Sequence, residues 1–132
     1  MIPKVIHYVW VGKNPLGSLQ EHCIASWRRY LPDYELMLWN EQTVPKEVFE
    51  HPYVHKMYTQ KKWAFVADYI RFWVLKREGG IYLDTDTEVL KSFETQLMDG
   101  AFFGKTKDGV IAARVIGAVP NQPAIEKILE VY

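Results

Sequence analysis

The chain has 132 residues, enough for one domain with a substantial hydrophobic core but short for an enzyme with two substrates. Its 16 basic residues balance its 16 acidic residues, so no net field draws nucleic acid, an anionic membrane or another polyanion to it. We therefore expect no nucleic-acid partner, and a local site for any anionic substrate. Apolar residues make up 48% of the chain, which favours a packed fold and excludes a disordered one.

The only cysteine, Cys23, has no partner for a disulfide within the chain. This suits a reducing compartment, and we expect a cytoplasmic protein. The amino terminus does not resemble a signal peptide, and no run of apolar residues has the length of a transmembrane helix. Peripheral attachment to a membrane stays open.

The first half of the chain alternates strand and helix. Val5 to Val11 is apolar and predicts a strand, which a loop rich in glycine and proline ends at Gly12. Ser18 to about Tyr30 has helical periodicity, with Ser18 as its cap, and Tyr34 to Trp39 predicts a second strand. The segment from Pro45 to Gln60 indicates short helical turns whose boundaries periodicity does not place.

In the second half, Lys61 to Glu78 predicts a long helix that is apolar almost all round and so buried on most sides, ended by Gly79 and Gly80. A brief strand, Ile81 to Leu83, leads into Asp84-Thr85-Asp86-Thr87. Three more extended pieces and a last helix follow: Glu88 to Leu90, Ala101 to Gly104, Val110 to Val119, and Gln122 to Tyr132.

This alternation predicts a single α/β domain over residues 1–132, with helices on both faces of a mainly parallel sheet. Ligands of such sheets bind at the carboxyl ends of the strands. We therefore expect Trp10 to Gly12, Asn40, and Asp84 to Asp86 to lie along one edge.

The pair Asp84 and Asp86 leaves a strand with one residue between the two carboxylates. Hard oxygen ligands on a short turn suit Mg²⁺ or Mn²⁺, which substrate phosphates and water then complete. Such an ion neutralises charge on a departing diphosphate. A bare Asp-x-Asp is also common as a plain polar turn, and its place after Gly79 to Leu83 is what makes the metal site the stronger interpretation.

Two charged residues, Asp68 and Arg71, lie on one stripe of the long apolar helix. They form either a structural ion pair at helical spacing or a grip for a ligand. Because buried charges are costly unless paired or used, a functional role is a real alternative. Arginine binds phosphate or sugar oxygens, and aspartate accepts hydrogen bonds from hydroxyl groups.

Aromatic residues offer one further candidate. Trp10 at the end of the first strand either stacks on a nucleobase or packs in the core. His7, on the same strand, is interpreted as a core histidine, because no second ligand lies at a zinc-like spacing from it. The remaining tryptophans are assigned to the core: Trp27, Trp39, Trp63 and Trp73.

Taken in order, several short motifs resemble one family, the sugar-binding region with a DXD motif of glycosyltransferase family 32. This family includes relatives of the yeast initiating mannosyltransferase and bacterial capsular glycosyltransferases. The large clostridial glucosylating toxins carry a more distant version. The motifs span residues 2–91 and are Ile2-Pro3-Lys4-Val5-Ile6-His7, Trp10-Val11-Gly12, Ser26-Trp27, Pro32-Asp33-Tyr34-Glu35, Leu38-Trp39-Asn40, Ala64-x3-Asp68-x2-Arg71, and Gly79-Gly80-Ile81-Tyr82-Leu83-Asp84-x-Asp86.

The resemblance implies a GT-A, Rossmann-like fold, a UDP- or GDP-sugar donor, Mn²⁺ or Mg²⁺, and hexose transfer with retention of configuration. It implies that Val9 and Trp10 bind the base, Asp68 and Arg71 the donor sugar, and Tyr82 the ribose and phosphates. Asp84 contacts sugar or ribose hydroxyls and assists in binding the metal, and Asp86 is the direct metal ligand. These two with Arg71 are the implied catalytic residues. The acceptor is a glycan or a lipid-linked molecule, in the assembly of a capsule or another polysaccharide.

Members of this family continue well beyond the position of Tyr132, so the fold is expected to be incomplete at its carboxyl end. One alternative is therefore a module that binds the nucleotide-sugar without transferring it. The other is a phosphatase of the haloacid dehalogenase type, with Asp84 as nucleophile and Asp86 as general acid.

Overall fold

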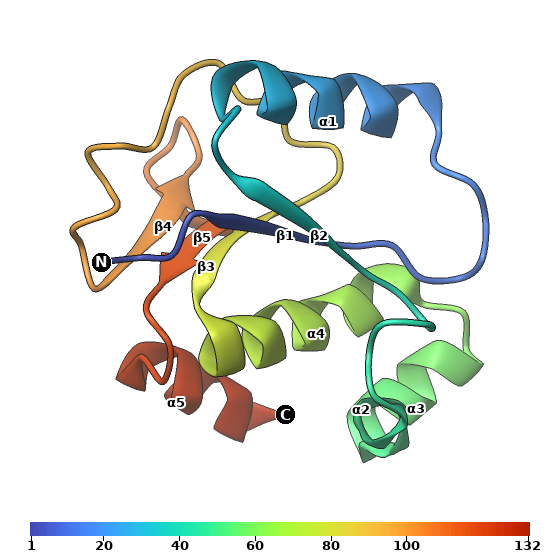
Figure 1. Cartoon of the computed structure of the whole chain (residues 1–132). Coiled ribbons are helices and arrows are strands. Elements are labelled where there is room, and N and C mark those ends of the chain that lie inside the picture. Colours follow the sequence, from blue (N-terminus) through green and yellow to red (C-terminus); the bar gives the residue numbers. More distant parts are fainter.

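The computed structural model describes all residues from 1 to 132 and contains one five-stranded sheet flanked by helices (Figure 1). The strands are β1 (Val5–Val9), β2 (Glu35–Trp39), β3 (Gly80–Leu83), β4 (Ala101–Lys105) and β5 (Ile111–Ala118). The helices are α1 (Ser18–Tyr30), α2 (Lys46–Glu50), α3 (Pro52–Thr59), α4 (Trp63–Glu78) and α5 (Pro123–Val131).

The sheet is parallel in one half and antiparallel in the other, in the order β2-β1-β3-β5-β4. Strand β1 pairs in parallel with both β2 and β3, whereas β5 runs antiparallel to β3 and to β4. The register between β4 and β5 shifts after Phe103, which marks a bulge. The prediction of a mainly parallel sheet therefore holds for the three strands that precede the Asp84 turn.

Helix α1 covers one face of the sheet, and α4 with α5 covers the other (Figure 1). Alternate residues of the central strands divide between two cores, as a pleated strand requires. Ile6 and Ile81 pack in the core on the side of α1, and Val9 and Tyr82 pack in the core on the side of α4. The prediction of helices on both faces is confirmed.

Helix α4 is long because apolar side chains such as Val66, Ile70 and Val74, all fully buried, recur at helical spacing. It ends where Gly79 and Gly80 take positive φ angles of 67° and 113°. A Cβ on Gly80 would lie 2.9 Å from the His7 imidazole, so glycine also permits close approach to β1. None of the helices is both long and apolar enough to span a bilayer.

The predicted core histidine is confirmed. His7 is buried, its Nδ1 accepts a 3.0 Å hydrogen bond from the indole of Trp39, and its Nε2 lies 2.8 Å from the Gly79 carbonyl oxygen. The accepting Nδ1 places the proton on Nε2, which donates to Gly79. Burial lowers the pKa of His7, which keeps the ring neutral.

Several predicted boundaries are wrong. Residues 88–90 form no strand, because the Val89 amide donates 2.9 Å to the Ser26 hydroxyl of α1 and not to a neighbouring strand. Strand β1 ends at Val9, two residues early, and α4 begins at Trp63, after Lys61 takes a positive φ of 57°. Gly17, and not Ser18, occupies the cap position of α1.

Helix α4 is also less buried than predicted. Its first two turns leave Ala64 and Phe65 exposed, and Phe65 has 48% of its surface accessible. The apolar stripe is complete only from Ile70 onward, where α4 lies between the sheet and α5. Of the two exposed residues, Ala64 lines the cleft that forms the candidate site.

Candidate functional site

A cleft of about 400 Å³ opens at the carboxyl ends of β1 and β3, beside the first turns of α4. Because β1 and β3 are parallel neighbours, the residues that follow them meet at one edge of the sheet, as open α/β sheets require. The cleft is lined by Val9, Trp10, Val11, Asn14, Gln20, Trp63, Ala64, Ala67, Arg71, Tyr82, Asp84, Thr85 and Asp86. Its volume is in the range of small-molecule sites.

The turn after β3 has a fixed backbone. The Asp84 amide donates 2.9 Å to the Arg114 carbonyl of β5, and the Thr87 amide donates 3.0 Å to the Asp84 carbonyl. The Trp27 indole of α1 then donates 2.8 Å to the Thr87 carbonyl. These bonds hold Asp84 partly buried at the base of the cleft, while Asp86 lies exposed at its rim.

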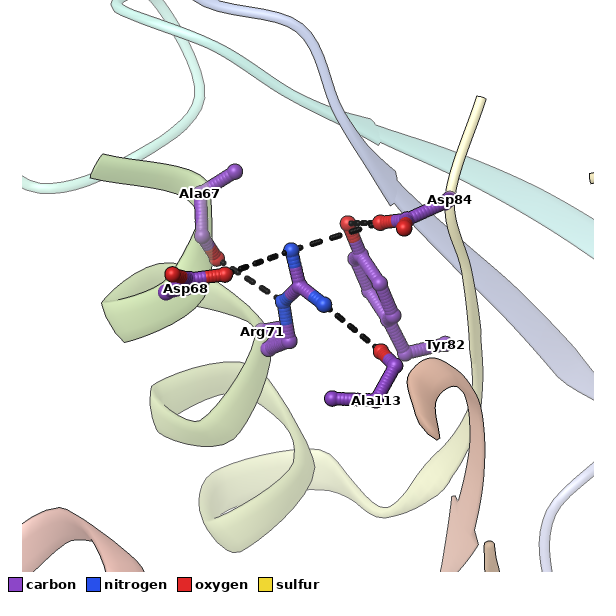
Figure 2. A network of polar contacts seen from close by, with 6 residues as sticks. All are labelled: Ala67, Asp68, Arg71, Tyr82, Asp84 and Ala113. Carbon is purple, nitrogen blue, oxygen red and sulfur yellow. Dashed lines mark hydrogen bonds and ion pairs between the residues drawn. The ribbon is translucent and has the colours of Figure 1, made fainter. Parts of the chain in front are cut away.

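Arg71 organises the polar base of the cleft (Figure 2). Its guanidinium donates 2.6 Å to the Ala113 carbonyl and 3.3 Å to the Ala67 carbonyl. The remaining terminal nitrogen lies 2.9 Å from a carboxylate oxygen of Asp68 and 3.3 Å from one of Asp84. Arg71 thus joins α4 to the end of β3 and to β5, and its side chain is only 7% exposed.

Tyr82 completes this cluster from below. Its ring is buried and its hydroxyl donates 2.7 Å to the same Asp84 oxygen that faces Arg71. The Arg71 guanidinium lies 4.5 Å from the Tyr82 ring centre, a cation–π geometry. Burial raises the pKa of Tyr82 well above its usual value, so the hydroxyl stays protonated and donates to Asp84.

Burial disfavours the ionised form of the Asp68 carboxylate. Burial raises its pKa, the nearby Asp84 charge adds to the rise, and the Arg71 guanidinium opposes it. The structure thus contains the Asp68–Arg71 ion pair that helical spacing predicts, extended to Asp84. Asp68 is not among the residues that line the cleft, although 37% of its side chain is exposed.

The loop after β1 forms the opposite wall. The Trp10 indole donates 2.7 Å to the Asn14 carbonyl, which fixes the ring against its own loop. The Gly12 amide donates 2.7 Å to Glu41, and the same Glu41 oxygen accepts a 2.8 Å bond from the Tyr58 hydroxyl. Although burial raises the pKa of Glu41, these hydrogen bonds lower it overall, so the anion that anchors the loop persists.

Trp63 was assigned to the core by its sequence pattern, but it is only partly buried and lines the cleft. A Cβ on Gly12 would lie 2.7 Å from the Trp63 indole, so glycine is what allows this ring to lie against the loop. The ring also packs edge-on against Tyr58, with centroids 5.0 Å apart. In the sequence, Gly12 indicates that another group approaches the loop closely, but it does not indicate that this group is Trp63.

The other tryptophans divide between core and partial burial. Trp27 and Trp39 are buried, as predicted, whereas Trp73 is partly exposed. Asn40, predicted to lie at the site, does not line the cleft. Its side chain instead accepts bonds from the Gln42 and Thr43 amides and stabilises the turn after β2.

The carboxylates available for a metal are few. No group of three or more histidine, cysteine, aspartate or glutamate side chains is placed to hold an ion. Asp84 and Asp86 are the only carboxylates that line the cleft, and one Asp84 oxygen is already bound by Tyr82 and Arg71. Two carboxylates suit Mg²⁺ or Mn²⁺, because these ions are completed by water and substrate phosphates.

Comparison with known proteins finds several sequence relatives. The chain is 28% identical to mannosyl phosphorylinositol ceramide synthase SUR1 of Saccharomyces cerevisiae, over 98% of this chain and 34% of the relative. It is 27% identical to inositol phosphoceramide mannosyltransferase 3 of Schizosaccharomyces pombe, over 97% and 36%. A glycosyltransferase of Acanthamoeba polyphaga mimivirus is 29% identical, over 98% and 55%. The chain thus spans about a third of the length of the two yeast relatives.

A solved structure shares the fold. PaToxG glycosyltransferase matches 98% of this chain and 58% of its own, with a TM-score of 0.75 and 22% identity. The likeness confirms the predicted GT-A-like fold, which in this chain has a mixed parallel and antiparallel sheet.

The model of the glycosyltransferase sugar-binding region containing the DXD motif matches residues 17–103. That range includes α4 and the Asp84 turn, and it sets aside a phosphatase of the dehalogenase type. The chain belongs to the family of glycosyltransferase sugar-binding regions that contain a DXD motif.

Proposed function

We propose that the cleft binds a nucleotide-sugar and that the protein transfers its hexose to an acceptor. The observation that carries the proposal is the convergence at one sheet edge of an aromatic wall, Trp10 and Trp63, with a charged base, Arg71, Asp84 and Asp86. The aromatic wall suits the flat face of a nucleobase. The charged residues at the floor of the cleft suit a diphosphate and its cation.

In this proposal the residues of the chain have distinct roles. Trp10 stacks on the nucleobase, and Val9 and Trp63 line the same cleft. Tyr82 and Arg71 hold Asp84 through one of its oxygens and leave the other for the donor. Asp68 orients Arg71 and accepts from hydroxyl groups of the sugar that reach it.

Asp84 and Asp86 would hold Mn²⁺ or Mg²⁺, which supplies neutralising charge to the departing nucleoside diphosphate. The Arg71 guanidinium adds a fixed positive charge at the base of the same cleft, and it is already positioned by two backbone carbonyls. A cation held in place before the donor arrives stabilises charge that develops as the sugar leaves. We assign transfer with retention of configuration by the family resemblance.

The acceptor is a lipid-linked molecule or a glycan. Relatives named as inositol phosphoceramide mannosyltransferases favour the lipid-linked class and a mannosyl donor, ahead of a capsular polysaccharide. The single unpaired cysteine, which is buried, is compatible with a cytoplasmic site of action.

Release of nucleoside diphosphate from UDP-hexoses and GDP-mannose, measured with and without Mn²⁺, tests the proposal. One donor should be consumed only with the metal, and Asp86→Ala should abolish this turnover. The exposed Glu50 of α2 offers a matched control, since Glu50→Ala removes a carboxylate that does not line the cleft. Turnover that survives in Asp86→Ala would contradict the assignment of the site. Binding without turnover would indicate a donor-binding module.

A further inference from the structure

A second groove, of about 490 Å³, lies on the other side of the Asp84 turn, between that turn and the β4–β5 hairpin. It is lined by Asp86, Thr87, Glu88, Gly104, Lys105, Thr106, Lys107, Ala112, Arg114 and Val115. Asp86 lines both this groove and the donor cleft. A molecule in the groove therefore lies next to the end of the cleft where the donor phosphates and their cation are proposed to bind.

Three cations line the groove: Lys105, Lys107 and Arg114. None of them takes part in any ion pair of the chain. Of the two acids in the lining, Glu88 lies 3.5 Å from His22 of α1. Arg114 is held beside the turn, because its carbonyl accepts the Asp84 amide. The groove thus carries unpaired positive charge on a chain whose net charge is zero.

The tip of the same hairpin is apolar. The Gly109 amide donates 3.0 Å to the Thr106 carbonyl and closes a tight turn. Immediately after it, Val110 and Ile111 leave 62% and 66% of their surfaces accessible. Two neighbouring aliphatic side chains therefore project into solvent beside Lys105 and Lys107, an arrangement suited to the boundary between lipid headgroups and acyl chains.

The chemistry of the lining decides between acceptor classes. Neutral glycans are bound by aromatic rings and neutral polar groups, and no aromatic residue lines this groove. A phosphate monoester or diester instead matches lysine and arginine, which supply charge and directed hydrogen bonds. The adjacent Val110 and Ile111 give an apolar contact that a soluble phosphate would not use.

We propose that this groove is the acceptor site and that the acceptor is a lipid with a phosphate in its headgroup. The phosphate lies among Lys105, Lys107 and Arg114, and the hairpin tip touches the acyl region, which presents the headgroup hydroxyl toward Asp86. This assignment rests on the proposed function, because it names the second substrate of the same transferase.

Sedimentation with vesicles tests the assignment directly. Phosphatidylcholine vesicles that contain phosphatidylinositol should bind the wild-type chain, and pure phosphatidylcholine vesicles should not. Lys105→Gln with Lys107→Gln should weaken the partition coefficient roughly 30-fold, since each lysine near an anionic surface contributes about fivefold. The matched control is Lys46→Gln with Lys56→Gln, two exposed lysines on α2 and α3, which lie away from the hairpin (Figure 1). It should bind like the wild type.

A second pair of arms separates a lipid from a free phosphate. Val110→Ser with Ile111→Ser should weaken vesicle binding roughly tenfold through lost apolar burial. Soluble inositol phosphate, titrated into the wild type, should bind much more weakly than the vesicles. Equal loss in the two lysine pairs, or unchanged vesicle binding in the Val110 and Ile111 variant, would overturn the assignment.

Failure of this inference is distinguishable from failure of the proposed function. A wild-type chain that binds nucleotide with Mn²⁺ but ignores the phosphatidylinositol vesicles contradicts the acceptor site alone. A chain that binds these vesicles through Lys105 and Lys107 but binds no nucleotide contradicts the donor site alone.

Discussion

Two buried polar clusters connect the central strands to α4, and they are closed to different degrees. His7 bonds only to Trp39 and to the Gly79 carbonyl, and nothing in that cluster reaches solvent. Arg71 is equally buried, but its partners Asp68 and Asp84 remain 37% and 25% exposed. Both ring nitrogens of His7 bond to protein groups. The cluster around Arg71 instead leaves carboxylate oxygens of Asp68 and Asp84 accessible to a ligand. This difference separates a structural role from a proposed functional one.

The largest effect is expected for Arg71→Met. It leaves Asp68 and Asp84 facing each other without their shared cation, and it leaves the Ala113 carbonyl without its donor. Breaking such a cluster should lower the free energy of unfolding by about 3 kcal/mol. Urea denaturation measures the loss, and titration with nucleotide should show that binding is lost as well. A variant with wild-type affinity would show that Arg71 is structural only.

The closed cluster should respond in stability alone. His7→Leu leaves the Trp39 indole and the Gly79 carbonyl without partners in the core, which should cost about 2 kcal/mol. Nucleotide affinity of the folded protein, measured by titration, should match the wild type. If a folded His7→Leu protein bound nucleotide more weakly than the wild type, the assignment of a purely structural role to the His7 cluster would be wrong.

Trp63 and Trp73 provide a matched pair on α4, because only Trp63 lines the cleft. Trp63→Leu should weaken nucleotide binding roughly tenfold by loss of one stacking surface. Trp73 packs edge-on against Trp39 at 6.0 Å, so Trp73→Leu should reduce the melting temperature without a change in affinity. Equal affinities for the two variants would remove Trp63 from the base site.

The smallest effect is a pH dependence at Asp68. Its pKa is raised in the folded state above the usual 3.8, so the folded protein keeps this proton up to a higher pH than the unfolded chain does. Stability contributed by this group is therefore present below pH 3.8 and is lost as the pH rises through the folded pKa. Denaturation curves across this window should show the fall in the wild type and not in Asp68→Asn. A fall of equal size in both proteins would assign it to another group.

Local signals placed most of the fold correctly. The apolar periodicity of α4, the glycines that end it, and the alternation of strand and helix were all readable from residue order. The segment from Glu88 to Leu90 was misassigned because its bonds go to Ser26, a partner 63 residues away that periodicity does not reveal. Tertiary contacts of this kind determined the errors.

The candidate site followed the same rule. Trp10 and Asp84 meet at the cleft because they follow neighbouring parallel strands, as topology predicts, and Arg71 reaches it from α4. The place of Trp63 could not be predicted because the ring packs against Gly12, a contact between distant residues that periodicity does not reveal. The groove of Lys105, Lys107 and Arg114 was missed because its charges come from a hairpin and meet only in three dimensions.

The most direct test of the donor site is isothermal titration of the wild type and Asp86→Ala with UDP and GDP, with and without Mn²⁺. We predict that the wild type binds one of the two nucleotides only when Mn²⁺ is present, and that Asp86→Ala loses this binding. Binding that is indifferent to Mn²⁺, or that persists unchanged in Asp86→Ala, would contradict the assignment of Asp84 and Asp86 to a metal and diphosphate site.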